Sequence, residues 1–348
     1  AAYAGLGLQV IQQAVAQEEI KVPFLEEWAG SGHADAAAEA FIHWDEDDPA
    51  EVPDRCAKCH STPGYLDFLG ADGTEFGVVD SAHEIGTTVE CEACHNDVTV
   101  GLDSVVMPSG VEITGLGSEA RCMQCHQGRQ SKVNVDEAIT EAGVGDDEVS
   151  EDLGFLNIHY YAAAATKYGT VAKGGYEYEG NAYDSNFVHV EEFDTCVECH
   201  DTHTLELKVE QCSECHADVA SAEDARDIRM AGSLVDYDGD GDMREGIYYE
   251  LEGMQESLYG AIQAYADEVA GEPITYDSAN YPYFLNSAGE GYNAWTPRLL
   301  KAAYNYQVAS KDPGNYAHGG KYIIQLLNDS IADLNTAIAT PVDMEAMH

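Results

Sequence analysis

Basic residues are scarce in this chain of 348 residues. It has 16 lysines and arginines against 64 aspartates and glutamates, which gives a formal net charge of -48. Such a surface repels nucleic acid and anionic membranes, so both are excluded as binding partners. Docking to basic redox partners would account for the charge, and so would simple solvation or adaptation to salt.

The chain also lacks a long hydrophobic run. No stretch approaches the roughly 18 apolar residues that cross a bilayer, so no membrane span is predicted. The sequence begins Ala1-Ala2-Tyr3, which is typical of the product left when a signal peptide is cleaved after small residues. We therefore expect an exported protein, extracellular or alternatively periplasmic.

Cysteine is absent after residue 215. Up to that position it occurs in a single pattern. All ten cysteines belong to five Cys-x-x-Cys-His motifs, which are Cys56-Ala-Lys-Cys59-His60, Cys91-Glu-Ala-Cys94-His95, Cys122-Met-Gln-Cys125-His126, Cys196-Val-Glu-Cys199-His200 and Cys212-Ser-Glu-Cys215-His216. In this signature of c-type haem, two thiols form thioethers to one porphyrin and the adjacent histidine supplies the proximal iron ligand. The sequence predicts five covalent haems, with iron.

Zinc and disulfides explain the motifs less well. A zinc module would pair its Cys-x-x-Cys units with further ligands at finger-like spacing, and it would not require a histidine after every second cysteine. A disulfide framework suits a secreted chain, but it leaves the five trailing histidines without a role.

The motif positions divide the chain into two parts. Residues 1–216 are predicted to form a pentahaem electron-transfer region with an N-terminal arm, and residues 217–348 a helical region without haem, the two packed as one unit. Only residues 201–211 separate His200 from Cys212, so the last two haems are expected to be close neighbours. Because five macrocycles would fill much of the core, we expect a mostly α fold with much irregular structure and few short strands.

Apolar periodicity and helix-end residues predict several helices. In the C-terminal part, they run from Leu251 to Val269, from Pro297 toward Pro313, and from Ile323 to Ile338. Earlier in the chain, shorter helices are expected at 34–40 and at the alanine-rich 158–165. A hairpin or loop is expected at 174–183, and a helix or an intersubunit strand at 8–16.

Each haem iron has a sixth position, and eight histidines lie outside the motifs. Sequence position favours five of them as distal ligands: His33, His43, His159, His189 and His203. His203 is too close to His200 to serve the far face of the same haem, so it is expected to serve a neighbour. His83 and His318 are held in reserve. Methionine, at Met107 or Met123, is the competing ligand, but the surplus of histidine favours bis-histidine, low-spin irons with no open position.

A second metal motif follows the haem region. Asp236, Asp238, Asp240 and Asp242 occupy positions 1, 3, 5 and 7 of an EF-hand-like loop with glycine at position 6, which indicates calcium. Position 12 is Ile247 rather than the bidentate glutamate, so Glu245 or Glu250 would have to substitute. The alternative is an acidic, solvated turn.

The chain resembles bacterial and archaeal multihaem c-type cytochromes. The resemblance rests on the five motifs, on Ser31-Gly-His33-Ala before the first of them, on Asn157-Ile-His159-Tyr and on Cys199-His200-Asp-Thr-His203. It implies electron transfer. Several secreted members of this group polymerise into extracellular haem filaments, so the resemblance also implies long-range electron conduction, with haems in alternating stacked and perpendicular pairs.

Filament membership would make the chain a head-to-tail homopolymer. In such filaments a histidine of one subunit can ligate a haem of the next, and His33 or His43 on the N-terminal arm is the expected donor. Redox proteins or extracellular acceptors would be the other partners. A soluble periplasmic shuttle is a second reading. A haem reductase of the nitrite or hydroxylamine type is a third, but the pentahaem nitrite reductases carry lysine in one motif where all five motifs here carry histidine.

Overall fold

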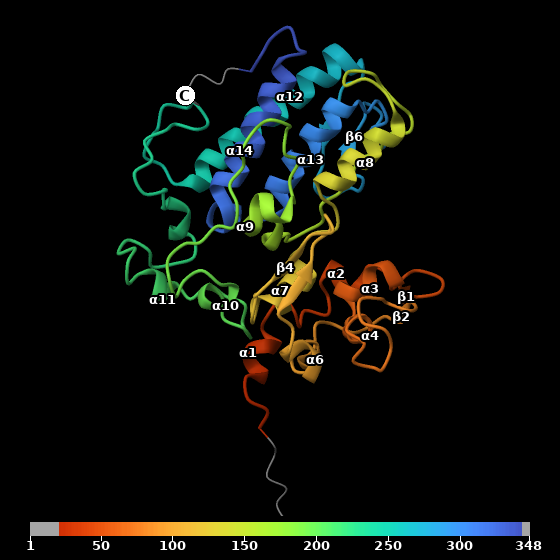
Figure 1. Ribbon diagram of the computed structural model, residues 1–348, viewed down its shortest axis with the longest axis vertical. Coiled ribbons are helices and arrows are strands. Elements are labelled where there is room, and N and C mark those ends of the chain that lie inside the picture. The colour runs from red at the N-terminus through yellow and green to blue at the C-terminus, as the bar shows by residue number, and fades with distance from the viewer. Residues whose placement is uncertain (1–20, 343–348) are drawn as a thin grey trace, which may run out of the picture.

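The computed structural model describes residues 21–342, and the segment predicted at 8–16 lies outside them. Figure 1 shows an elongated molecule with a helical upper part and a looser lower part. The chain is helix-rich with few short strands and much irregular structure, which confirms that part of the predicted fold class.

The lower part is made of short elements joined by loops (Figure 1). Its helices are α1 (Leu25–Ala29), α2 (Glu39–Ile42), α3 (Asp54–His60), α4 (Thr62–Phe68), α5 (Cys91–Cys94), α6 (Asp97–Val100) and α7 (Glu119–His126). Two antiparallel strand pairs accompany them, β1 (Glu51–Val52) with β2 (His83–Glu84) and β3 (Ser104–Val106) with β4 (Glu112–Thr114). The first three motifs begin or lie within these short helices, so loops rather than long elements hold this region.

The upper part is a bundle of longer helices. It contains α12 (Ile247–Tyr265), which continues as the single π-helical segment η2 (Ala266–Ala270), α13 (Pro297–Lys311) and α14 (Asn315–Asn335), with the strand pair β5 (Thr275–Tyr276) and β6 (Phe284–Leu285). The three predicted C-terminal helices are therefore confirmed. At the start of α13 the Thr296 hydroxyl accepts a hydrogen bond from the Leu299 amide at 3.1 Å, a cap worth about 1 kcal/mol.

The stretch between the third and fourth motifs joins the bundle. It contributes α8 (Lys132–Ala142) and α9 (Ala163–Ala172), and α10 (Cys196–Cys199), α11 (Val209–Cys212) and the 3₁₀ turn η1 (Asp224–Asp227) follow. Val135, Ile158 and Ala165 are buried in the same apolar cluster as the C-terminal helices. The core therefore crosses the predicted boundary at 216/217.

Two local expectations for the haem region are wrong. The alanine-rich helix begins at Ala163 rather than at residue 158, because His159 and Tyr161 have φ values of 79° and 54°, far from the value of about -63° of a right-handed α-helix. The helix expected at 34–40 is instead a series of turns followed by α2. Residues 174–183 form a loop.

Candidate haem sites and an acidic metal site

Each of the five motif histidines faces one histidine from outside the motifs. The pairs and their ring-centroid separations are His60–His159 at 5.7 Å, His95–His203 at 6.2 Å, His126–His33 at 6.2 Å, His200–His318 at 6.4 Å and His216–His189 at 6.0 Å. A histidine–metal bond is about 2 Å, so two imidazoles on opposite sides of one ion have centroids roughly 6 Å apart. The donor sets therefore fit five bis-histidine haem irons.

Backbone carbonyls fix the orientation of three motif histidines. Nδ1 of His60, His126 and His200 lies 2.8, 3.0 and 3.1 Å from the carbonyl oxygens of residues 40, 161 and 205. A carbonyl can only accept, so Nδ1 carries the proton and Nε2 keeps the lone pair that a metal needs. The surrounding backbone thus selects the tautomer that leaves Nε2 free to bind a metal.

The His60–His159 pair is the tightest. Its two Nε2 atoms point at each other across 3.4 Å. The left-handed backbone at His159 and Tyr161 lets one short segment serve two sites, because the Tyr161 carbonyl accepts the hydrogen bond from His126. Strained backbone of this kind persists where surrounding structure holds it, and here the Tyr161 amide donates to the Lys311 carbonyl at 2.8 Å.

Two of the facing histidines have strongly lowered pKa values. Burial, followed by the charge of His126, lowers the pKa of His33 to about 4. Burial, followed by the charge of His60, lowers the pKa of His159 to about 4. Both imidazoles are therefore neutral at neutral pH, which is the form that binds iron.

His33 is held by the segment that precedes the second motif. Its carbonyl accepts from the Val89 amide at 3.1 Å, and Trp28 Nε1 donates to the Val89 carbonyl at 2.9 Å. The Ser31 hydroxyl closes the intervening turn by donating to the Trp28 carbonyl at 2.7 Å. These bonds place the N-terminal arm so that His33 meets His126 of the same chain.

Four of the five predicted distal histidines face a motif histidine, and one does not. His33, His159, His189 and His203 do so, and His203 meets the neighbouring motif at His95. His43 instead contacts Glu39 at 2.9 Å and the edge of Trp44, so this geometry does not support its predicted distal role. His318, held in reserve, takes the remaining place opposite His200. His83, the other reserve, bonds to the buried Asp67 at 3.0 Å.

The motifs meet in an order that differs from their order in the sequence. Helix α7, with the third motif, contacts both α3 and α10. The Cys59 and Cys125 thiols are within hydrogen-bonding reach, which lowers the pKa of Cys59 to about 7. A similar contact joins Cys122 to Cys196. The third motif therefore lies between the first and the fourth, and Cys199 is near enough to Cys212 for the two thiols to interact electrostatically. No disulfide joins any of the ten cysteines, all of which lie within residues 21–342.

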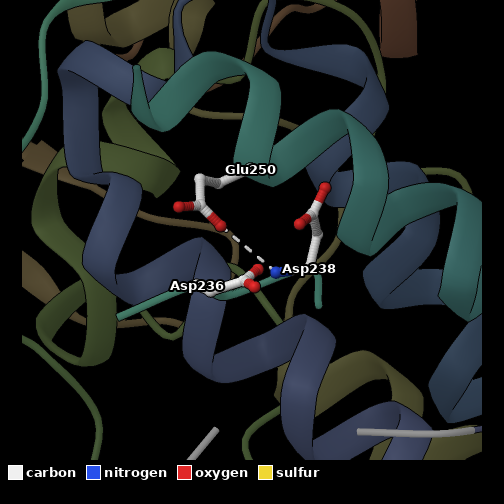
Figure 2. A group of neighbouring side chains, drawn as sticks. All are labelled: Asp236, Asp238 and Glu250. Carbon is white, nitrogen blue, oxygen red and sulfur yellow. Dashed lines mark hydrogen bonds between the residues drawn. The ribbon is translucent and has the colours of Figure 1, made fainter. Parts of the chain in front are cut away.

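The predicted calcium loop brings carboxylates together at the start of α12. Figure 2 shows Asp236, Asp238 and Glu250 converging. A second cluster contains Asp238, Asp240 and Glu245. Asp242 belongs to neither cluster, and its carboxylate accepts from the Arg244 amide. Sequence reasoning therefore found three of the converging carboxylates by loop position and named both glutamates only as substitutes.

Crowding raises the pKa values of two of these carboxyls. Burial and the neighbouring carboxylates raise the pKa of Asp238 to about 6 and that of Glu245 to about 7. One Glu245 oxygen is buried without a hydrogen-bond partner. Glu250 is different because Arg229 neutralises it through a buried ion pair and the Asp238 amide donates to it. The unneutralised charge therefore lies between Asp238, Asp240 and Glu245, where a hard cation would fit.

No helix in the described part of the chain is both long and apolar enough to cross a membrane. Residues 23–96 match the family described as cytochrome c554 and c-prime, a range that includes the first two motifs, His33 and His43.

Among curated proteins, the C-type polyheme cytochrome OmcB of Geobacter sulfurreducens is 24% identical over 380 residues, covering 89% of this chain and 48% of that protein. OmcC of the same species is 25% identical over 389 residues, covering 90% and 48%. The chain therefore spans about half the length of the curated relatives it matches. No solved structure matches it.

Proposed function

We propose that this chain, which is a multihaem c-type cytochrome, carries electrons through five c-type haems, one at each Cys-x-x-Cys-His motif. The observation that supports five is the five facing histidine pairs, one for each motif. Each bound haem would supply an iron that gains and loses a single electron. The cysteines would hold the porphyrins as thioethers, and each histidine pair would fill both axial positions.

Filling both axial positions makes the protein a carrier rather than an enzyme. A reductase of the nitrite or hydroxylamine type needs one iron with an open position for substrate. Within residues 21–342 every motif histidine has a facing histidine, so no site favours that alternative. A soluble periplasmic shuttle would use the same five closed irons and would differ only in assembly.

Assembly into an extracellular filament is the further part of the proposal. It is supported by the family resemblance and by the contacts that join the first, third and fourth motifs. Ligand exchange between subunits is not required, because His33 faces His126 of its own chain. His43, whose side chain is 60% exposed and faces no motif histidine, is the remaining donor if subunits do exchange a ligand.

Calcium at the acidic loop completes the proposed cofactors. Asp236, Asp238, Asp240 and Glu245 would supply carboxylate oxygens, the ligands that calcium prefers. Bound there, the ion would hold the loop that joins the last motif to α12. Redox proteins or extracellular acceptors remain the proposed partners.

Mass spectrometry and spectroscopy of the exported protein test the central proposal. The denatured chain should carry the added mass of five haems, and its ferric EPR spectrum should contain only low-spin signals. Fewer than five haems would contradict the motif assignment. A large high-spin ferric signal would contradict bis-histidine coordination of all five irons and would support the reductase alternative.

A further inference from the structure

A buried carboxylate lies against one of the facing histidines. Asp312 is 1% exposed, and both of its carboxylate oxygens lie 2.9 Å from Nδ1 of His318. The Gly314 amide donates to the same carboxylate at 3.1 Å. Asp312 follows the last residue of α13, and His318 lies in the first turn of α14, so the connection between two bundle helices fixes their geometry.

The Nδ1 contacts of the other facing histidines are to neutral groups. His60, His126 and His200 donate to backbone carbonyls, and His203 reaches the Thr202 hydroxyl at 3.4 Å. Among the ten facing histidines of the described chain, His318 is the one whose Nδ1 contact is a carboxylate. The site of His200 and His318 therefore has a negative charge one imidazole away from the iron position.

The nearby cations do not cancel this charge. Lys167 and Lys208 are the lysines close enough to act on the site. Lys167 is paired with the buried Glu119 at 3.4 Å. Lys208 donates to the Val197 carbonyl at 2.6 Å and acts on His200 rather than on His318. The charge of Asp312 therefore acts on His318 at hydrogen-bonding distance, and on His200 and His126 at longer range, in surroundings where water does not screen it.

A buried carboxylate hydrogen-bonded to a metal-binding imidazole makes that ligand more basic and electron-rich. It stabilises the ferric iron relative to the ferrous iron, because reduction removes a positive charge beside a fixed negative one. We infer that Asp312 is a positioning residue that gives the haem held by Cys196, Cys199, His200 and His318 the lowest reduction potential of the five. This inference rests on the proposed function.

The residue before Asp312 has the opposite charge and acts on a different site. The Lys311 ammonium is buried 3.6 Å from the centroid of the Tyr160 ring and 4.3 Å from that of Tyr283, and it acts on His159. A cation beside the His60–His159 pair favours the ferrous iron there. Asp312 and Lys311 thus give the haem of the fourth motif a lower reduction potential than the haem of the first motif. In space, the third motif lies between these two motifs.

Redox titration of the full-length, haem-loaded protein with and without Asp312→Asn tests this. Five one-electron transitions are expected in the wild type. The variant should shift the lowest of them upward by at least tenfold in the ferric–ferrous equilibrium, which is about 59 mV for one electron. Asp312→Glu keeps the charge and should keep the low potential. If the asparagine variant folds poorly, His318→Ala supplies the test, because it assigns the lowest potential to this site or to another.

Asp67→Asn is the matched control. Asp67 is also a buried carboxylate bonded to a histidine, His83, at 3.0 Å, but that histidine faces no motif. Its removal should leave all five potentials unchanged. His318→Ala identifies the site, because the low-spin component that it removes should be the one with the lowest potential.

The outcomes separate the two proposals. A fully loaded Asp312→Asn protein with unchanged potentials would overturn the inference alone, as would an equal shift in Asp67→Asn. Loss of a higher-potential component in His318→Ala would also overturn it. A wild-type chain without haem at Cys196 and Cys199 would overturn the proposed function and the inference together.

Discussion

The hydrogen bond at Nδ1 decides which nitrogen each imidazole presents to its partner. For His60 and His126 the acceptors are the backbone carbonyls of Ala40 in α2 and of Tyr161 in a turn, 20 and 35 residues away in the sequence. Any residue can supply a backbone carbonyl, so the sequence carries no sign of this support. The backbone conformation of these segments, rather than their side chains, orients the imidazoles.

Exchanging His318 and His43 for alanine distinguishes the ligand assignments. His318→Ala should remove one axial ligand, so that one haem in five becomes high-spin while all five stay covalently attached. His43→Ala should leave the spectrum unchanged, because that side chain contacts only Glu39 and Trp44. EPR and haem counting by mass spectrometry measure both effects. A high-spin signal in His43→Ala but not in His318→Ala would show that His43, rather than His318, is an axial ligand.

Sequence position predicted four of the five facing histidines. It worked for His33 on the arm before the first motif, for His189 shortly before Cys196, and for His203, which is too near His200 in the sequence to serve the same haem. It failed for His318 because α14 brings that residue back to the fourth motif from far along the chain, a tertiary contact that no local pattern encodes. His43 was predicted because it is near the first motif in the sequence, but its side chain does not face a motif histidine.

The acidic loop and α12 form one structural unit at the level of elements. Asp238→Asn and Glu245→Gln should each abolish the calcium-dependent rise in thermal stability, since both remove oxygens from the cluster that lacks a basic partner. Calcium at a hundred times its Kd would stabilise the wild type by about 2.7 kcal/mol. Calorimetry with and without calcium measures the rise. Asp242→Asn should keep it, because that carboxylate lies outside both clusters; loss of the rise in Asp242→Asn as well would contradict the proposed ligand set.

An ion pair fastens α13 to the segment before the alanine-rich region, and its strength should depend on pH. Arg298 Nε lies 2.7 Å from Asp147, and this hydrogen bond lowers the pKa of the carboxyl. A carboxyl whose pKa is lower in the folded than in the unfolded state stabilises the fold at pH values above its unfolded-state pKa of about 4. This stabilisation is lost as the pH falls through the folded-state pKa. Asp147→Asn should therefore destabilise the protein at pH 7 and approach the wild type at pH 3.

The size of that effect is limited by solvent. The Asp147 side chain is 46% exposed, so the loss at pH 7 should be under about 1 kcal/mol. Thermal melts of both proteins at the two pH values measure it. Asp146→Asn, which removes a more exposed contact with Lys301, should have a smaller effect at pH 7. A constant difference between Asp147→Asn and the wild type at all pH values would exclude the ion pair as its cause.

Among the elements, the long helices were predictable and the short ones were not. Apolar periodicity and helix-end residues such as Thr296 and Gly271 predict the bundle helices. In the haem region the alanine-rich stretch is helical only from Ala163, because His159 and Tyr161 before it adopt left-handed backbone. Tertiary hydrogen bonds such as that from the Tyr161 amide to the Lys311 carbonyl hold this conformation, and local propensity cannot predict them.

At the scale of the whole molecule, one apolar core ties the motif-bearing chain to the bundle. Val135 and Ile158 pack in the same cluster as Leu251 and Leu327, although the motif spacing suggested a division at 216/217. Consequently Asp312 of the bundle reaches a histidine pair of the haem region. The helical part thus contributes to the electrostatics of the haem sites as well as to stability.

The net charge of -48 opposes any assembly of identical chains. Like charges on two subunits interact over about 10 Å at 0.1 M salt and only about 3 Å at 1 M salt. A filament of this chain therefore has to screen or bind cations where subunits meet. Its formation should depend strongly on ionic strength, which is unexpected for an assembly held by apolar contacts or by ligand bonds alone.

Light scattering and cryo-EM of the haem-loaded protein across salt concentrations test this dependence. Monomers should dominate at 20 mM NaCl and filaments at 500 mM, and calcium should promote assembly at lower ionic strength than sodium does. Asp238→Asn separates two roles of calcium, since it removes the loop site but leaves general screening intact. If this variant assembles as the wild type does, calcium acts by screening. Monomers at every salt concentration would contradict the filament proposal and favour the soluble shuttle. Filaments already complete at 20 mM NaCl would show that contacts other than screened charge control the assembly.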